Sequence, residues 1–156
     1  MILDRLASKA RAGFSFQKNW RAEIATHGRT VFCKPQGYMN VSGEPLAAVS
    51  RFYKIPANEI LVVLDDAALP LGRLRIRPGG SSGGHNGLQS ILDHVGDVPR
   101  LRVGIGGAND GGMTGHVLGR FTAGETPVLE ESLARAVEAV EFVREKGIEA
   151  AMNKFN

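Results

Sequence analysis

The distribution of apolar and polar residues along the chain predicts alternating helices and strands. Apolar residues recur at helical spacing over residues 2–10. Segments 21–26 and 29–34 have strand composition, with residues 27–28 between them, which is typical of a β-hairpin with a two-residue turn. A helix capped by Ser42 is predicted to follow the hairpin.

The second half of the chain continues this alternation. The apolar run 60–64 predicts a strand buried on both faces, because a strand covered on one face would alternate. Residues 73–77 and 100–105 alternate apolar and basic side chains and predict half-exposed strands. A long helix is predicted from residue 126, followed by a short amphipathic tail. The order predicts an α/β fold: one domain over residues 1–156 with a mixed, twisted sheet flanked by helices.

Composition and charge limit the classes of protein to which this chain can belong. The chain has 19 Lys and Arg against 16 Asp and Glu, a net charge of +3 that by itself does not identify a nucleic-acid-binding protein. The single cysteine, Cys33, excludes an intrachain disulfide and fits a reducing compartment. We find no zinc-ligand spacing, no membrane-length apolar run and no signal-peptide pattern. A soluble cytoplasmic protein without a metal is expected.

Residues 78–87 are the most informative segment, because five of the ten are glycine and an apolar helical pattern follows at once. A flexible, donor-rich loop at a helix N-terminus can bind an anion or a polar substrate. The segment lacks the Lys-Ser/Thr ending of a P-loop and the glycine spacing of a dinucleotide fingerprint. The alternative is a plain strand-to-helix connection, which is less favoured because His85 and Asn86 stand where the loop meets the helix N-terminus. Asn86 is compatible both with an N-cap role and with ligand contact.

Residues 34–43 join a predicted strand to a predicted helix and form a second candidate segment. Such strand ends are where α/β proteins build their sites. Tyr38 offers a stacking face, and Asn40 offers both a donor and an acceptor. A well-capped turn with Met39 in the core explains the same residues.

Charged residues at strand ends and on strand faces form the third candidate group. Asp65 and Asp66 follow the apolar strand, and adjacent strand residues point to opposite faces, so a shared metal is not expected. One of these carboxylates could orient a catalytic histidine. Basic residues at alternating positions could track phosphates or could simply solvate a sheet face. These residues are Arg73, Arg75, Arg77, Arg100 and Arg102.

Taken together, these segments resemble the bacterial peptidyl-tRNA hydrolase family. The likeness covers nearly the whole chain in family order, and the combination of Met39-Asn40 with residues 83–87 is specific. The matching segments are 34–43, 60–72, 79–87, 100–106 and 117–121. The resemblance implies hydrolysis of the ester that joins a peptide to the 3′ end of tRNA, which recycles tRNA in translation and serves ribosome rescue. It also implies a monomer that needs no metal or other cofactor.

The resemblance assigns roles to individual residues of this chain. In the family a histidine activates water, and Asp65 matches the residue that supports that histidine. Asparagine amides near the ester carbonyl can position the substrate and stabilise the oxyanion. The matching positions are Tyr38, Asn40 and Asn86 for tRNA or peptide, Met39 for the wall of the cleft, and Arg77 and Arg102 for phosphate.

The chain departs from the family at its beginning. Family members normally begin with a strand, a Gly-Asn-Pro-Gly loop and a Thr-Arg-His-Asn segment, whereas residues 1–7 match the helix that follows these. The first strand and the catalytic histidine are therefore expected to be absent from this chain. Three explanations stay open: a truncated gene model of a normal enzyme, a shortened homologue that binds tRNA without hydrolysing it, or an enzyme in which His85 is a surrogate base.

Overall fold

The computed structural model describes residues 2–36, 41–106, 124 and 126–156. The chain divides into two compact units, each built from two stretches of sequence. The first unit comprises Met1–Ile60 and Gly79–Val98, and the second comprises Leu61–Pro78 and Pro99–Asn156. Both units contain helices and strands, so the predicted α/β class is confirmed.

The first unit contains a three-stranded antiparallel sheet. The strands, in order across the sheet, are β1 (Ser15–Gln17), β2 (Ala22–His27) and β3 (Thr30–Pro35). The predicted hairpin is confirmed, but His27 pairs with Thr30, so the turn lies over residues 28–29 rather than 27–28. Gly28 has φ +59°, which glycine adopts at little cost. The sequence did not predict β1, because three residues are too few for an alternating pattern to be recognised.

Two helices of the first unit contact its sheet at β3. Both α1 (Ile2–Lys9) and α2 (Gly43–Tyr53) contact β3, and α2 also contacts α3 (Asn86–His94). A short 3-10 helix, η2 (Ala57–Glu59), follows α2. The prediction of a helix over the first residues is confirmed, since its buried side chains share one face.

The beginning of α2 differs from the prediction. Ser42 stands at the N-cap position, but its backbone is helical and its side chain makes no capping hydrogen bond. The N–H of Gly43 instead donates to Oγ of Ser90 on α3, at 2.9 Å. A Cβ at Gly43 would collide with the carbonyl oxygen of Ser90. The two helices therefore approach closely, and a tertiary hydrogen bond takes the place of the expected cap.

The second unit contains the predicted mixed sheet, although the hairpin strands lie in a separate sheet. β4 (Val62–Asp66) runs parallel to β6 (Arg100–Gly104), and β5 (Leu74–Arg77) runs antiparallel to β6. β6 is central and is buried at four of five positions, so the predicted half-exposed strand is wrong. In the described sheet β4 is an edge strand on which only Leu64 is fully buried, so burial on both faces is also wrong.

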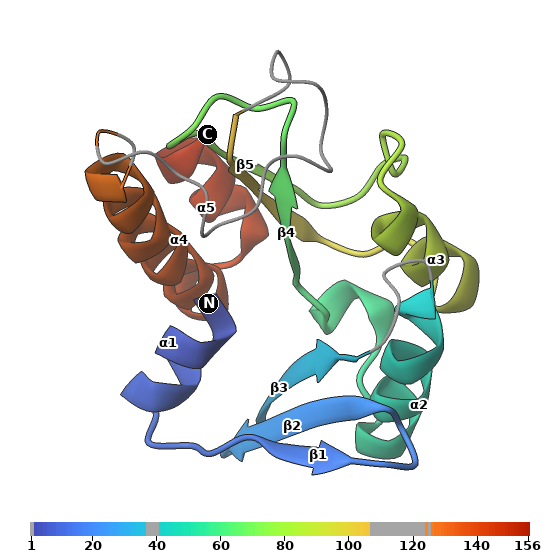
Figure 1. Ribbon diagram of the computed structural model, residues 1–156. Helices are drawn as coiled ribbons and strands as arrows, with labels where there is room; N and C mark the ends of the chain where they lie inside the picture. The colour runs from blue at the N-terminus through green and yellow to red at the C-terminus, as the bar shows by residue number, and fades with distance from the viewer. Residues whose placement is uncertain (1, 37–40, 107–123, 125) are drawn as a thin grey trace. The chain divides into compact units, whose positions relative to one another are not determined.

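Two helices complete the second unit. α4 (Thr126–Lys146) contacts β6, and α5 (Ile148–Phe155) contacts β5 (Figure 1). Gly147 lies between the helices with φ +91°, which allows the chain to turn there. The long helix and the amphipathic tail were both predicted and are confirmed. The apolar residues of α4 that are buried in this unit are Leu129, Leu133, Ala136, Val137, Ala139 and Val140.

Candidate functional site

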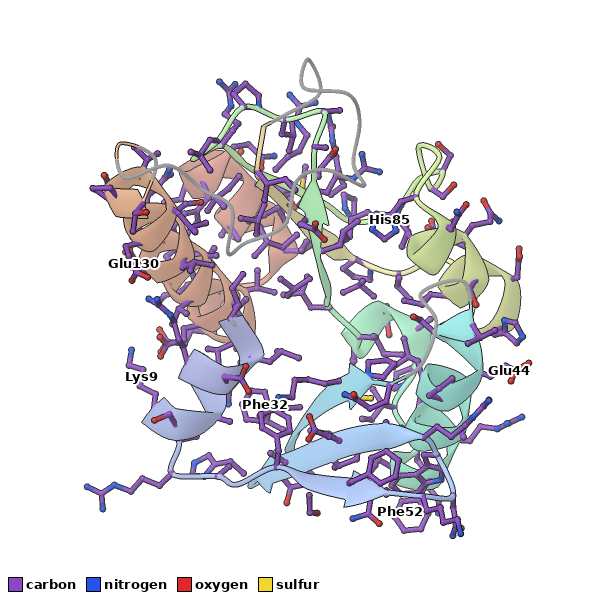
Figure 2. The ribbon with its side chains drawn as sticks, in the orientation of Figure 1. Lys9, Phe32, Glu44, Phe52, His85 and Glu130 are labelled. Carbon is purple, nitrogen blue, oxygen red and sulfur yellow. The ribbon has the colours of Figure 1, made fainter. Side chains whose placement is uncertain are left out.

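The glycine-rich loop leads into α3 in the first unit. His85 is the N-cap residue of this helix, and its Nδ1 accepts a hydrogen bond from the N–H of Leu88 at 3.1 Å (Figure 2). Asn86 is the first helical residue and is exposed, and its side chain makes no hydrogen bond with any described residue. Of the two roles considered for Asn86, capping therefore belongs to its neighbour, and its amide is available to a ligand.

The glycines of this loop also satisfy structural requirements. Gly80, Gly83 and Gly84 have φ of +125°, +62° and +87°, values that other residues rarely adopt. The N–H of Gly80 donates to Oδ1 of Asp97 at 3.0 Å, and a Cβ at Gly79 would collide with the same carboxylate. The turn conformation and the Asp97 contact therefore explain much of the glycine content without a ligand.

The two acidic residues at the end of β4 have different environments. Asp66 lies within 3.4 Å of Nη1 of Arg102, and its Oδ1 accepts a hydrogen bond from the N–H of Ala68 at 2.9 Å. Asp65 is exposed and forms no hydrogen bond or ion pair with the described residues. The register places Asp65 beside Val103 and Asp66 beside Gly104 on the parallel strand. Asp66 pairs with Arg102, and the alternation of side chains along a strand directs Asp65 to the opposite face of the sheet.

Arginines from two strands share one face of the mixed sheet. The antiparallel register sets Arg75 opposite Arg102 and Arg77 opposite Arg100, and directly opposite residues point to the same face. Like charges in this arrangement repel one another, and Asp66 pairs with one of the four, Arg102. Arg100 is buried, whereas Arg75 and Arg77 are exposed. We call this group of four arginines the arginine face.

Arg102 has an unmet hydrogen-bonding requirement. Its Nε is buried and has no partner among the described residues, and its bond to Asp66 is long at 3.4 Å. A buried guanidinium N–H without an acceptor is destabilising, so an anionic oxygen from a ligand would relieve it. The geometry of this face is therefore suited to phosphate, which accepts from several arginine N–H groups together.

The structure describes some of the predicted site residues and not others. Tyr38, Met39 and Asn40 lie outside the described residues, as does the segment 117–121. The predicted residues that are placed divide between the two units. His85 and Asn86 belong to the first unit; Asp65, Arg77 and Arg102 belong to the second.

The other two described histidines, His27 and His94, lie outside the predicted site segments. His94 donates from Nδ1 to the carbonyl oxygen of Ser90 at 2.8 Å, and its Nε2 is 3.9 Å from Glu44. His27 is exposed at the end of β2. Among the residues with described positions, no cluster of three or more His, Cys, Asp or Glu side chains could hold a metal ion. No helix within the described ranges is both long enough and apolar enough to cross a bilayer.

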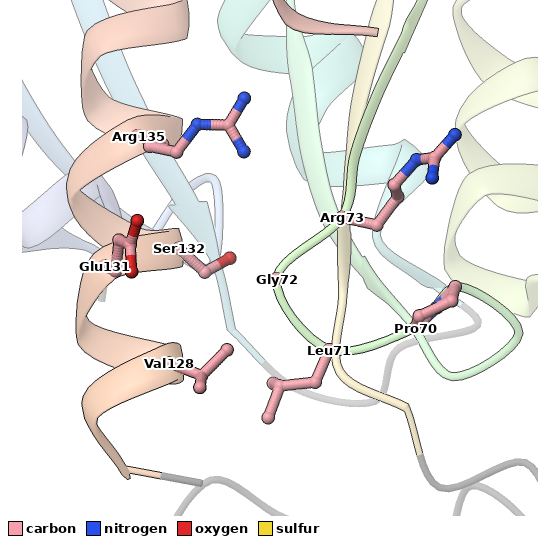
Figure 3. A pocket seen from close by; sticks show the side chains of 8 residues that line it. All are labelled: Pro70, Leu71, Gly72, Arg73, Val128, Glu131, Ser132 and Arg135. Carbon is pink, nitrogen blue, oxygen red and sulfur yellow. The ribbon is translucent and has the colours of Figure 1, made fainter.

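A pocket in the second unit was not predicted from the sequence. It lies between the β4–β5 loop and α4, with a volume of about 370 Å³ (Figure 3). Oγ of Ser132 is buried beside it and lacks a hydrogen-bond partner among the described residues. None of the predicted site residues lines this pocket. Its lining consists of Pro70, Leu71, Gly72, Arg73, Val128, Glu131, Ser132 and Arg135.

The sequence also missed the pairing of Asp66 with Arg102, which are 36 positions apart. Adjacent acidic residues gave no sign of which carboxylate would meet a cation. The alternating arginines did carry a signal, since each strand places its arginines on a single face. Only the antiparallel register shows that the two faces are the same one.

Comparisons with known proteins agree on one family. A family model described as peptidyl-tRNA hydrolase matches residues 1–156. The chain is 45% identical to a peptidyl-tRNA hydrolase of Synechococcus sp. (strain JA-2-3B'a(2-13)) over 165 residues, which covers 100% of this chain and 73% of that protein. It is 49% identical to the peptidyl-tRNA hydrolase of Caldanaerobacter subterraneus subsp. tengcongensis over 130 residues, covering 82% of this chain and 70% of the relative.

Solved structures give the same result for the fold. The crystal structure of peptidyl-tRNA hydrolase from Acinetobacter baumannii matches with a TM-score of 0.88 and 30% sequence identity. The match covers 99% of this chain and 82% of that one. The α/β architecture with a mixed sheet and flanking helices is therefore shared with an experimentally solved relative.

Proposed function

Because the chain belongs to the peptidyl-tRNA hydrolase family, we propose that it acts on peptidyl-tRNA, hydrolysing the ester between the peptide and the 3′ end of the tRNA. The observation that carries this proposal is the family match over all 156 residues. We further propose that the protein works as a monomer in the cytoplasm, where a single reduced cysteine is expected.

Ester hydrolysis assigns separate tasks to the residues of the site. A general base removes a proton from water, the resulting hydroxide attacks the ester carbonyl, and negative charge develops on the carbonyl oxygen. The exposed amide of Asn86 is available to donate to the substrate. The bond to the ribose oxygen then breaks, and that oxygen takes up a proton as tRNA leaves. Asp65, exposed and without an ion pair among the described residues, is proposed to orient the base.

The arginine face supports the tRNA part of the proposal. Arg75, Arg77 and Arg102 present cationic groups on one sheet face, and a buried Nε of Arg102 awaits an acceptor. Phosphate contacts of this kind position a nucleic acid without reading its sequence. We therefore propose that Arg77 and Arg102 bind the tRNA backbone.

Whether this chain supplies a general base distinguishes two candidate functions, ester hydrolysis and tRNA binding without hydrolysis. The chain has four histidines, and the Thr-Arg-His-Asn segment typical of the family does not occur in these 156 residues. His85 uses Nδ1 to cap α3, and no carboxylate is bonded to its ring among the described residues. The capping role of His85 favours a second candidate function, a tRNA-binding protein without hydrolytic activity.

The decisive experiment measures hydrolysis of an N-blocked aminoacyl-tRNA and binding of uncharged tRNA by the same purified chain. If no side chain of these 156 residues acts as the general base, kcat is expected to be about 10²- to 10⁴-fold lower than that of the Synechococcus relative assayed in parallel. Full turnover would contradict that expectation. Binding with no measurable turnover would establish the second candidate function, and the absence of both would contradict the family role.

Two variants locate the chemistry if turnover is found. His85→Asn removes the imidazole but retains a side chain that caps helices well, so lost turnover with an unchanged melting temperature would identify His85 as the base. Asp65→Asn should lower kcat and leave the Kd for tRNA unchanged. Asp93→Asn, at an exposed position on α3, is the matched control and should change neither.

A further inference from the structure

Three aromatic rings of the first unit form a cluster at its surface. Trp20, from the turn between β1 and β2, lies 5.0 Å from Phe52 and 6.1 Å from Tyr53 between ring centroids. Phe52 and Tyr53, at the end of α2, are 4.9 Å apart in an edge-on arrangement. Phe52 is 65% exposed and Tyr53 is 36% exposed (Figure 2 labels Phe52). We call these three residues the aromatic platform.

The platform is anchored from beneath. Trp20 is partly buried and packs against the core cluster of Ala22, Ile24 and Val49. The rings are therefore held in place while one of them presents most of its surface to water. Large exposed aromatic groups that are also fixed in position are typical of surfaces that bind a partner.

Basic residues flank the platform in both segments that build it. Residues 18–21 read Lys-Asn-Trp-Arg and residues 51–54 read Arg-Phe-Tyr-Lys, with no acidic residue in either. Arg21 pairs with Glu44 at 2.7 Å. Lys18, Arg51 and Lys54 are exposed and form no ion pair with any described residue. Each of the three aromatic residues is thus adjacent in sequence to a cationic residue.

We propose that the aromatic platform binds unpaired bases of an RNA strand, with the flanking cations contacting its phosphates. Bases stack on aromatic side chains regardless of sequence, and positively charged residues beside the rings follow the backbone. A purely apolar protein partner would leave Lys18, Arg51 and Lys54 without a role, which is why charge favours RNA. The inference goes beyond the proposed function, which requires the arginine face and the ester-cleaving residues but not these rings.

The chain carries its own reporter for this test, because Trp20 is its single tryptophan. An oligouridine of about 12 nucleotides, labelled for anisotropy, serves as the probe and contains no ester substrate. Stacking on the platform should quench Trp20 fluorescence with the same Kd that anisotropy reports. Phe52→Leu keeps apolar area but removes the ring, and the affinity should fall about tenfold.

Charge variants distinguish phosphate contacts beside the aromatic platform from a general attraction between RNA and a positively charged protein. Lys18→Gln with Lys54→Gln should reduce the slope of log K against log salt by about 1.4, or about 0.7 for each lost phosphate contact. Arg144→Gln with Lys146→Gln removes the same charge from the end of α4 and should leave the slope and the Trp20 quenching unchanged. Thermal unfolding of each variant checks that the fold is retained.

Three results would overturn the proposal. One is oligouridine binding without quenching of Trp20, which would place RNA elsewhere. Another is an unchanged affinity in Phe52→Leu, which would show that apolar area rather than an aromatic face is recognised. The third is self-association that buries Trp20, which would identify a second copy of the chain as the occupant. None of these results bears on ester hydrolysis, so the proposed function is tested separately.

Discussion

At the scale of single residues, local contacts decide which of two neighbouring side chains is available for chemistry. His85 is occupied in capping α3, whereas Asn86 is exposed and unbonded within the described part of the chain. Asp66 is paired with Arg102, whereas Asp65 is not paired in that part. In each pair, the residue without a side-chain partner in the described part of the chain is the one proposed to take part in the reaction.

Substitution of Gly104, at the end of β6, tests how closely the loop after β4 packs against this strand. A Cβ at this position would collide with the carbonyl oxygen of Pro70, a backbone atom that cannot move aside cheaply. We expect Gly104→Ala to lower the free energy of unfolding by about 1–3 kcal/mol. Gly13→Ala is the control, since nothing lies within 4 Å of its added Cβ. Urea unfolding measures both, and equal stabilities would contradict the close approach.

Cys33, on β3, gives a pH-dependent prediction. Burial raises the pKa of its thiol to about 11, because desolvation disfavours the thiolate. At pH 8 only about one molecule in a thousand then carries the reactive thiolate. A disulfide reagent should label the native protein slowly at pH 8, faster as the pH approaches 11, and rapidly in urea at pH 8. Rapid labelling of folded protein at pH 8 would contradict the burial.

At the scale of elements, the C-terminal residue secures the outer edge of the mixed sheet. Oδ1 of Asn156 accepts from the N–H of Ile76 at 2.6 Å, and its Nδ2 donates to the carbonyl oxygen of Ile76 at 3.0 Å. The side-chain amide thus satisfies the backbone of β5 as a further strand would. Because β5 carries Arg75 and Arg77, this contact also holds half of the arginine face in place.

Removing the Asn156 amide should destabilise β5. Asn156→Ala leaves both backbone groups of Ile76 without these partners, and we expect a loss of about 1–3 kcal/mol in unfolding free energy. Hydrogen exchange at the Ile76 amide should become markedly faster. Asn153→Ala, at an exposed position on the same helix, should alter neither quantity. Unchanged protection of Ile76 in Asn156→Ala would show that the edge is held by other contacts.

At the scale of the whole molecule, charge distribution matters more than net charge. A net charge of +3 is modest, yet four arginines occupy one face of a three-stranded sheet. A local concentration of positive charge attracts a polyanion even when the total is small. Binding to tRNA is therefore expected to be strongly dependent on ionic strength.

Salt titration of tRNA binding measures this contribution. If Arg75, Arg77 and Arg102 each neutralise one phosphate, the slope of log K against log salt includes about −2.7 from this face. Arg102→Gln should weaken binding and reduce the slope by about 0.9. Arg144→Gln, which removes an exposed charge from α4, should leave both unchanged. An unaltered slope in Arg102→Gln would mean that its guanidinium does not contact phosphate.

Much of this protein follows from local sequence pattern. The helices over the first residues, after Ser42 and from Thr126 were predicted because side chains on one helical face recur with a fixed period. The hairpin, the alternating strand at Leu74–Arg77 and the opposite orientations of Asp65 and Asp66 follow from the two-residue period of a strand. The family could be predicted because its motifs are short and contiguous in the chain.

What the tertiary structure alone decided concerns partners distant in sequence. The position of β6 at the centre of its sheet made a strand that alternates in sequence buried instead of half-exposed, since burial depends on neighbouring strands as well as on side-chain period. The Gly43–Ser90 bond displaced the expected Ser42 cap. The sequence by itself therefore determined most of the elements and the family, because both depend on contiguous residues. The register, packing and pairing that assemble the arginine face and the aromatic platform required long-range contacts.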